Sequence, residues 1–229
     1  MFFYDYYYLV LVVPAIILSL LAQIKVQSTY KKYAAIISKQ GLTATEVVRQ
    51  ILDKNGLHHV RVEHIGGNLT DHFDPKTNVI RLSDVVYGNT SVASIGVAAH
   101  EAGHAVQHAT GYAPIKIRNS ILPIANFGSR LSVPLIILGL ILSMQPLVEF
   151  GILLFSFVLL FQLVTLPVEF NASHRAIRTL KEGSILAGDE LAGAQKVLGA
   201  AAMTYVAAAL TTAMQLLRLL LISRRSNRR

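Results

Sequence analysis

The chain has 229 residues, enough for one domain of ordinary size plus several membrane spans. Apolar residues make up 53% and charged residues only 15%, a balance that a soluble domain of this size would struggle to hide from water. The net charge of +8 does not indicate nucleic acid, because much of the excess lies beside apolar segments, where basic residues meet anionic lipid head groups. Without cysteine, disulfides and thiolate metal sites are excluded, so imidazole and carboxylate groups must hold any metal ion.

The first apolar run, residues 9–22, follows a cluster of tyrosines typical of membrane interfaces and predicts a transmembrane segment within residues 1–24. A cleaved signal peptide is the alternative. It is disfavoured because Asp5 is the charged residue before the run, no Lys or Arg precedes it, and no small-residue cleavage pattern follows it.

Residues 25–130 have the mixed charge and turn signals of a water-exposed region, which we predict to be the catalytic one. Thr43 and Glu46 form a capping-box pattern that predicts a helix ending near Asn55. A second and longer helix is predicted over residues 91–109.

Between these helices, alternating hydrophobicity predicts a strand over residues 58–65, and a turn at 74–78 leads into another strand, 79–83. Many proteins bind an extended peptide by adding it to an exposed strand edge, and strand 79–83 is a candidate for that role. An ordinary core strand is the alternative interpretation.

Long apolar runs return after the catalytic region. Residues 131–166 predict a two-span transmembrane hairpin. Residues 167–229 are predicted to hold a helix that opens just after Pro167 and a final Ala-rich helix, residues 197–222, followed by a basic tail. This final helix either spans the bilayer or packs on the protein.

The strongest chemical signal is the sequence His100-Glu101-Ala102-Gly103-His104, an H-E-x-x-H pattern inside the predicted helix 91–109. Residues four apart on a helix project from one face, so both imidazoles can bind one metal ion. Zinc held in this way keeps a position for water, lowers the pKa of that water and polarises a carbonyl group. Glu101 is predicted to be the general base that takes a proton from the zinc-bound water.

A third zinc ligand must come from elsewhere. The metzincin pattern is excluded, because Gln107 and Thr110 occupy the positions of its Gly and third His. His108 lies another turn along the same face, too far away to share the ion. Glu169 is the best candidate, because it follows two membrane crossings that return the chain to the side of the H-E-x-x-H helix. The alternative is a carboxylate favoured by a helix N-terminus.

Two cations follow this glutamate. His174 and Arg175 are candidates to stabilise the oxyanion of a tetrahedral intermediate, or alternatively to meet lipid phosphates at the interface. The histidines of the strand region show no ligand spacing and are interpreted as surface or structural residues: His58, His59, His64 and His72.

Three stretches of the sequence resemble a known family: LTDHFDP at 69–75, VAAHEAGHAVQH at 97–108 and LPVEFNAS at 166–173. They are similar to the neutral zinc metallopeptidases of bacterial membranes, the YugP-like family, and the resemblance covers nearly the whole chain. It implies a bacterial multi-pass membrane peptidase with Zn²⁺ as cofactor, His100 and His104 as ligands and Glu101 as catalytic residue.

A looser likeness exists to membrane peptidases of the heat-shock protease and CAAX-prenyl protease type, which have a strand, an H-E-x-x-H helix and a later Glu in the same order. Those peptidases place an Asp four residues after the ligand Glu. Here that position is Ser173, which can hydrogen-bond but supplies no charge.

The predicted fold class is α+β and predominantly helical, with a small zincin-type, gluzincin-like catalytic domain and integral membrane helices.

Basic residues near the predicted spans share one side of the membrane: Lys25, Lys31, Lys32, Lys116, Arg118, Arg130, Arg175, Arg178 and Lys181. The positive-inside rule makes that side cytoplasmic, which predicts a protein of the bacterial inner membrane with a cytoplasmic active site. A fourth full span would put the basic tail outside, against the same rule. This favours packing of residues 197–222 on the protein, or only partial entry of this segment into the membrane.

The predicted function is zinc-dependent hydrolysis of peptide bonds, the reaction of a metalloendopeptidase. The expected partners are the lipid bilayer and a peptide or protein substrate, and no nucleic acid is expected. A homo-oligomer and a membrane partner are both possible. A non-catalytic, metal-stabilised scaffold and a hydrolase of non-peptide amides are the alternatives. A structural zinc site normally has four protein ligands, which favours the peptidase.

Overall fold

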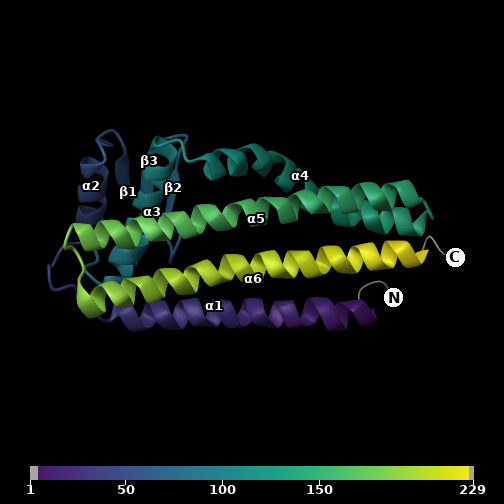
Figure 1. The fold of residues 1–229 in the computed structure, drawn as a ribbon, viewed down its shortest axis with the longest axis horizontal. Helices are drawn as coiled ribbons and strands as arrows, with labels where there is room; N and C mark the ends of the chain where they lie inside the picture. Colours follow the sequence, from purple (N-terminus) through teal and green to yellow (C-terminus); the bar gives the residue numbers. More distant parts are fainter. Residues whose placement is uncertain (1–4, 227–229) are drawn as a thin grey trace. The chain divides into compact units, whose positions relative to one another are not determined.

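The computed structural model describes residues 5–226, which form mostly helices and a three-stranded sheet (Figure 1). The elements in chain order are η1 (Tyr8–Val12), α1 (Val13–Ala34), α2 (Ala44–Lys54), β1 (Arg61–Ile65), β2 (His72–Asp74), β3 (Val79–Ser83), α3 (Val92–Ala109), α4 (Ala113–Ile141), α5 (Gln145–Glu182) and α6 (Gly188–Ser226). The predicted predominance of helix is confirmed, whereas the zincin type of the catalytic region stays a prediction. The end of the predicted basic tail, residues 227–229, lies outside the described residues.

The chain divides into two compact units, each of them discontinuous in sequence. Unit 1 consists of Met1–Gln23, Lys116–Pro167 and Thr204–Arg229, and unit 2 consists of Ile24–Ile115 and Val168–Met203. Helices α1, α4, α5 and α6 contribute residues to both units. Helix α5 has 38 residues, or about 57 Å, roughly twice the ~30 Å hydrocarbon thickness of a bilayer. A helix of this length can cross a membrane and continue into a water-exposed region.

Unit 2 contains the sheet, with α2 and α3 beside it (Figure 1). The strand order is β1-β3-β2, with β1 parallel and β2 antiparallel to β3. The strand predicted over residues 79–83 is present as β3. The suggestion that it offers a free edge is wrong, because β3 pairs on both sides and the edges belong to β1 and β2.

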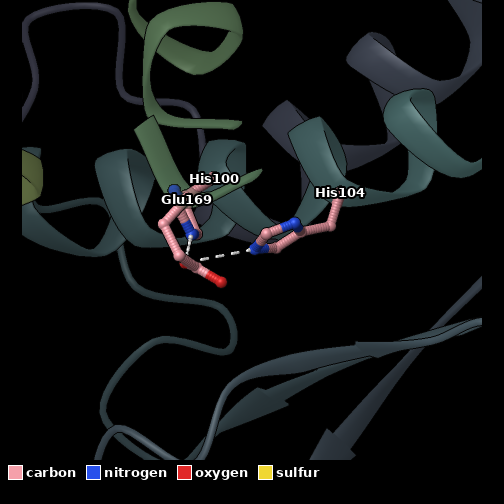
Figure 2. Close-up of side chains that lie close together, drawn as sticks. All are labelled: His100, His104 and Glu169. Carbon is pink, nitrogen blue, oxygen red and sulfur yellow. Dashed lines mark ion pairs between the residues drawn. The ribbon is translucent and has the colours of Figure 1, made fainter. Parts of the chain in front are cut away.

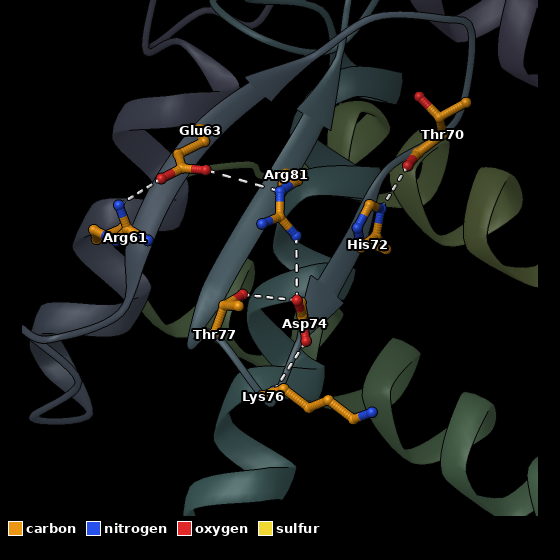
Figure 3. Close-up of polar contacts among 8 residues, drawn as sticks. All are labelled: Arg61, Glu63, Thr70, His72, Asp74, Lys76, Thr77 and Arg81. Atoms are coloured by element: carbon orange, nitrogen blue, oxygen red, sulfur yellow. Dashed lines mark hydrogen bonds and ion pairs between the residues drawn. The ribbon is translucent and has the colours of Figure 1, made fainter. Parts of the chain in front are cut away.

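Polar side chains link the three strands (Figure 3). Arg81 of β3 pairs with Glu63 of β1 at 3.8 Å and with Asp74 of β2 at 3.4 Å. Asp74 also accepts hydrogen bonds from the Thr77 hydroxyl and the Lys76 backbone N–H, at 2.7 and 2.9 Å. These bonds lower the pKa of Asp74 to about 2. The turn predicted from the sequence after β2 is thus closed by its own aspartate.

The two predicted helices of unit 2 are present as α2 and α3, and side chains cap both of them. Thr43 and Glu46 form the predicted capping box at the start of α2. Ser91 caps α3 by accepting a hydrogen bond from the Ser94 backbone N–H at 3.3 Å. The Tyr30 hydroxyl, on α1, lies 3.3 Å from the Ser94 hydroxyl, so α1 anchors the start of the H-E-x-x-H helix.

The core of unit 2 surrounds α3 with apolar side chains from helices and strands. Its largest fully buried members include Leu52 of α2, Leu82 of β3, Ile95 of α3 and Leu180 of α5. Each such side chain contributes about 1.5–3 kcal/mol when it leaves water. This packing holds α3 between the sheet and the α5 segment of the same unit.

Unit 1 contains the strongly apolar parts of the long helices. Four helices are long and apolar enough to cross a membrane: Tyr8–Ala34, Ala113–Ile141, Gln145–Glu182 and Gly188–Ser223. The N-terminal span and the hairpin predicted from the sequence correspond to the first three. The final Ala-rich helix also meets these criteria of length and composition.

Within unit 1, α4 and α5 approach each other closely at glycines. A Cβ atom on Gly128 would lie 2.5 Å from the Leu154 carbonyl oxygen, and one on Gly151 would lie 2.9 Å from the Ser132 carbonyl oxygen. Small residues allow such backbone contact between membrane helices, where no apolar solvent effect drives association. Helices α4 and α5 are therefore tightly packed against each other at these glycines.

Helix α5 differs from the prediction at Pro167. A new helix was expected to open just after this proline, but α5 begins at Gln145 and continues through it. Membrane helices tolerate internal prolines because neighbouring groups can satisfy the freed backbone carbonyl. Glu169 is consequently an internal residue of a long helix, and the alternative that it is a helix N-terminal carboxylate is wrong.

Candidate metal centre

Three side chains from two helices converge in unit 2, as Figure 2 shows. His100 and His104 project from one face of α3, and Glu169 reaches them from α5. Glu169 Oε2 lies 3.3 Å from His100 Nε2 and 3.6 Å from His104 Nε2. Among the described residues 5–226, these three form the one group of three or more His, Cys, Asp or Glu side chains that could hold a metal ion.

The spacing of these ligand atoms fits zinc. With bonds of about 2.0–2.1 Å, two ligand atoms on a tetrahedral zinc ion lie roughly 3.3–3.4 Å apart. The two nitrogen–oxygen separations of 3.3 and 3.6 Å are close to that value. Two imidazoles and one carboxylate are also the donor set of catalytic zinc sites that keep a fourth position open.

The other ring nitrogen of each histidine has a partner. His100 Nδ1 lies 3.1 Å from the Ser173 hydroxyl, and His104 Nδ1 lies 3.0 Å from Gln107 Oε1. Ser173 is four residues after Glu169, so both project from one face of α5 and both reach His100. With each Nδ1 engaged in this way, the two Nε2 atoms are left to face the carboxylate and a metal ion.

A close approach of backbones brings α5 to α3. A Cβ atom on Gly103 would lie 2.8 Å from the Ala172 carbonyl oxygen. Since the obstructing atom belongs to the backbone, a larger residue at this position would push the helices apart. Glycine between the two ligand histidines therefore allows Glu169 to reach them.

The site has a negative electrostatic character. Burial lowers the pKa of His104, but the hydrogen bond with Glu169 and the charges of Glu101 and Glu169 raise it, and the net pKa is above the ordinary value. An environment that favours a proton on a buried imidazole also favours another cation. This field suits a divalent metal ion.

Glu101 lies on α3 next to His100, and it is only 8% exposed. Its side chain points about 100° around the helix axis from that of His100. Its charge acts on His104, so the carboxylate is close to the site although it does not belong to the three-residue ligand group. A position near the metal ion but outside its ligand group is compatible with the role of a general base.

His174 and Arg175, which follow Glu169 on α5, have different surroundings. Arg175 Nε donates a hydrogen bond to Asn171 Oδ1 at 2.8 Å. His174 lines an apolar groove between α5 and α6, together with Phe170, Ile177 and Leu198. Their roles as oxyanion stabilisers stay predictions.

The remaining histidines lie outside the ligand group. His58 pairs with Asp53, His64 pairs with Asp84, His72 Nδ1 contacts the Thr70 carbonyl oxygen, and the His108 ring packs on Phe73. None of these residues, nor His59, belongs to the group that could hold a metal ion within residues 5–226.

Sequence reasoning missed a polar network behind His104. Gln107 is fully buried, and its Nε2 donates hydrogen bonds to the Val168 carbonyl oxygen at 2.8 Å and to Asn171 Oδ1 at 3.0 Å. In the sequence, Gln107 served only to exclude the metzincin pattern. A polar residue one turn from a ligand on a buried helix face was the available signal.

Comparison with known proteins adds to this geometry. The family described as "Putative neutral zinc metallopeptidase" matches residues 8–224. The chain belongs to this family. It is also 45% identical over 215 residues to the "Putative membrane protease YugP" of Bacillus subtilis (strain 168), covering 94% of this chain and 96% of the relative. The resemblance stated from the sequence is thereby confirmed.

No solved structure matches this member of the zinc metallopeptidase family. At the level that the comparisons support, the chain is a membrane-associated protein of a zinc peptidase family. The three-residue group of His100, His104 and Glu169 is compatible with the metal in the family's name.

Proposed function

We propose that this protein is a membrane zinc endopeptidase in which His100, His104 and Glu169 hold zinc and Glu101 is the general base. The observation that carries the proposal is the position of one Glu169 oxygen, 3.3 and 3.6 Å from the two Nε2 atoms. Three protein ligands leave room for substrate, whereas a structural site usually has four.

Zinc bound there would supply a Lewis acid that polarises the substrate carbonyl and makes water more acidic. Glu101 would accept a proton from the attacking water as the water oxygen bonds to the carbonyl carbon. It would then deliver that proton to the amide nitrogen as the carbon–nitrogen bond breaks. Ser173 and Gln107 would hold the two imidazoles in place during both steps.

An extended substrate would add to β2, which is an edge strand and lies beside the metal helix. Phe73 of β2 packs against His108 of α3 with ring centroids 5.9 Å apart. Backbone hydrogen bonds along this edge would bind a peptide with little sequence selectivity. This assignment replaces β3, which has neighbours on both sides.

The proposed location is a bacterial inner membrane, crossed several times, with unit 2 on the cytoplasmic side. Lys31 and Lys32, in the last turn of α1, and Lys181, in the last turn of α5, support that side by the positive-inside rule. The chain has no cysteine, so Lys76→Cys would introduce a unique thiol in unit 2. Labelling by an impermeant maleimide in intact cells would contradict this orientation.

The decisive experiment compares wild type with Glu101→Gln at matched, measured zinc content, using an unfolded protein as substrate in detergent. Loss of a general base is expected to lower hydrolysis by about 10²–10⁴-fold without loss of zinc. Glu190→Gln is the matched control. Glu190, on α6, is as buried as Glu101, but it lies outside the proposed zinc site and accepts a hydrogen bond from the Lys39 backbone N–H, in the loop after α1.

Three results would count against parts of this proposal. If wild type binds zinc but does not cut protein, and Glu101→Gln binds the same amount of zinc, the non-catalytic scaffold becomes the better account. If hydrolysis survives in Glu101→Gln, the assigned base is wrong. Hydrolysis of small amides without proteolysis would favour the third alternative, a hydrolase of non-peptide amides.

A further inference from the structure

The fully buried amide of Gln107 connects the two helices that carry the metal ligands. Its oxygen lies 3.0 Å from His104 Nδ1 on α3, and its nitrogen donates to the Val168 carbonyl oxygen, one residue before Glu169 on α5. We propose that Gln107 is a positioning residue that sets the tautomer of His104 and fixes its distance from Glu169. The inference rests on the proposed zinc site, but its test does not depend on hydrolysis.

The hydrogen bonds decide which way the amide of Gln107 points. A backbone carbonyl oxygen can only accept a hydrogen bond, so the atom beside Val168 must be the NH₂ nitrogen. The atom beside His104 Nδ1 is then the amide oxygen, which can only accept. A neutral His104 must therefore carry its proton on Nδ1, which leaves the lone pair of Nε2 available for a metal ion.

A second chain of bonds leads to the same orientation. Arg175 Nε can only donate, and it donates to Asn171 Oδ1 at 2.8 Å. The same oxygen accepts from Gln107 Nε2 at 3.0 Å. Arg175 thus fixes the direction of Asn171, and Asn171 together with Val168 fixes the direction of Gln107.

The other ligand histidine has no comparable device. The Ser173 hydroxyl beside His100 Nδ1 can donate or accept, so this contact is compatible with either tautomer. The structure therefore places the stronger constraint on His104. We expect changes at Gln107 to affect metal binding more than changes at Ser173.

The test is the zinc dissociation constant of detergent-purified protein, measured by competition with a chromogenic chelator. Gln107→Met removes all three bonds at similar volume, and we expect zinc to bind about 10–100-fold more weakly. Gln107→Glu keeps an oxygen acceptor for His104 but loses both donated bonds, so zinc affinity should stay within about threefold of wild type. Gln40→Met, which removes an exposed amide bonded to Ser184, is the control.

Thermal unfolding of the zinc-free variants separates positioning from general stability. A carboxylate facing two acceptor oxygens should destabilise the fold more than methionine does. The proposal therefore requires Gln107→Glu to be the less stable variant and the better zinc binder. It is overturned if zinc affinity falls in the same order as stability, or if Gln107→Met binds zinc as wild type does.

A measurement on wild type tests the same inference without any variant, so it does not depend on whether the variants fold. With ¹⁵N-labelled histidine and zinc, His104 should show a ring proton on Nδ1 that exchanges slowly with water, and its absence would contradict the inference. If wild type binds no zinc, this inference and the proposed function both fail. If it binds zinc as described but does not hydrolyse peptides, only the proposed function fails.

Discussion

Each compact unit buries charged side chains, but the two units treat them differently. In unit 2 one carboxylate meets two imidazoles, and Glu101 adds further negative charge nearby. In unit 1 the Arg218 guanidinium, whose side chain is 4% exposed, donates from Nε and Nη2 to a single oxygen of Asp5, at 2.9 and 2.6 Å. Arg218 also stacks over the Tyr8 ring at 5.2 Å.

The difference is one of charge balance. In unit 1 a positive and a negative group neutralise each other, so the pair needs no ligand and its function is structural. In unit 2 the Glu169 carboxylate faces two imidazoles, which are charged only when protonated, so this arrangement can take up a proton or a metal ion. A buried polar cluster whose members are also metal-ligating groups is therefore a candidate binding site.

The largest expected effect is at Glu169, the proposed third ligand. Glu169→Ala should weaken zinc binding by more than about 100-fold, which is more than the loss of a residue that only hydrogen-bonds a ligand causes. It should also abolish hydrolysis. Zinc content after dialysis against a weak chelator measures this. Retention of stoichiometric zinc by Glu169→Ala would show that another residue completes the site.

The next effect concerns the ion pair of unit 1. Asp5→Ala leaves Arg218 buried without its carboxylate, which should cost about 3–5 kcal/mol of stability. The double variant Asp5→Ala with Arg218→Met should recover much of that loss, because two compensating charges leave together. Thermal unfolding in detergent reports the stability, and zinc affinity should not change in either variant. A fall in zinc affinity would mean that the units are not independent in this respect.

A smaller effect is expected at the helix contact behind the ligands. Gly103→Ala places a methyl group against the Ala172 backbone and should cost about 1–3 kcal/mol, with weaker zinc binding because Glu169 moves away. Gly199→Ala is the matched control, since its Cβ would meet nothing within 4 Å and helix propensity should stabilise it by about 0.5–1 kcal/mol. Equal stability of the two variants would refute the close contact.

The smallest effect is the pH dependence of the sheet. The pKa of Asp74 is lowered from 3.8 to about 2, so its ionised form stabilises the folded state above pH 3.8 and this contribution is lost as the pH falls toward 2. Wild type should therefore be more stable than Asp74→Asn at pH 7, and the difference should shrink in acid. Denaturant midpoints at both pH values measure it. A constant difference would exclude ionisation as its cause.

Much of the local structure could be predicted from the sequence. The capping box at Thr43, the strand over 79–83 and the helix over 91–109 depend on neighbouring residues, and each is present. The approach of His100 to His104 follows from the helical repeat alone. Pro167 was misjudged because local propensity opposes a proline inside a helix, whereas surrounding helices can compensate for it.

The sequence by itself therefore determined the membrane association and the helix that carries the H-E-x-x-H pattern, and its lack of cysteine restricted any metal ligands to imidazole and carboxylate groups. Only the tertiary structure decided which strand is an edge, how Gly103 admits the backbone of α5 and which amide orients His104. Periodicity and capping act over a few residues, so they can be recognised along the chain. The meeting of Gln107 with Val168 and Asn171 joins residues more than sixty positions apart, and packing alone brings them together.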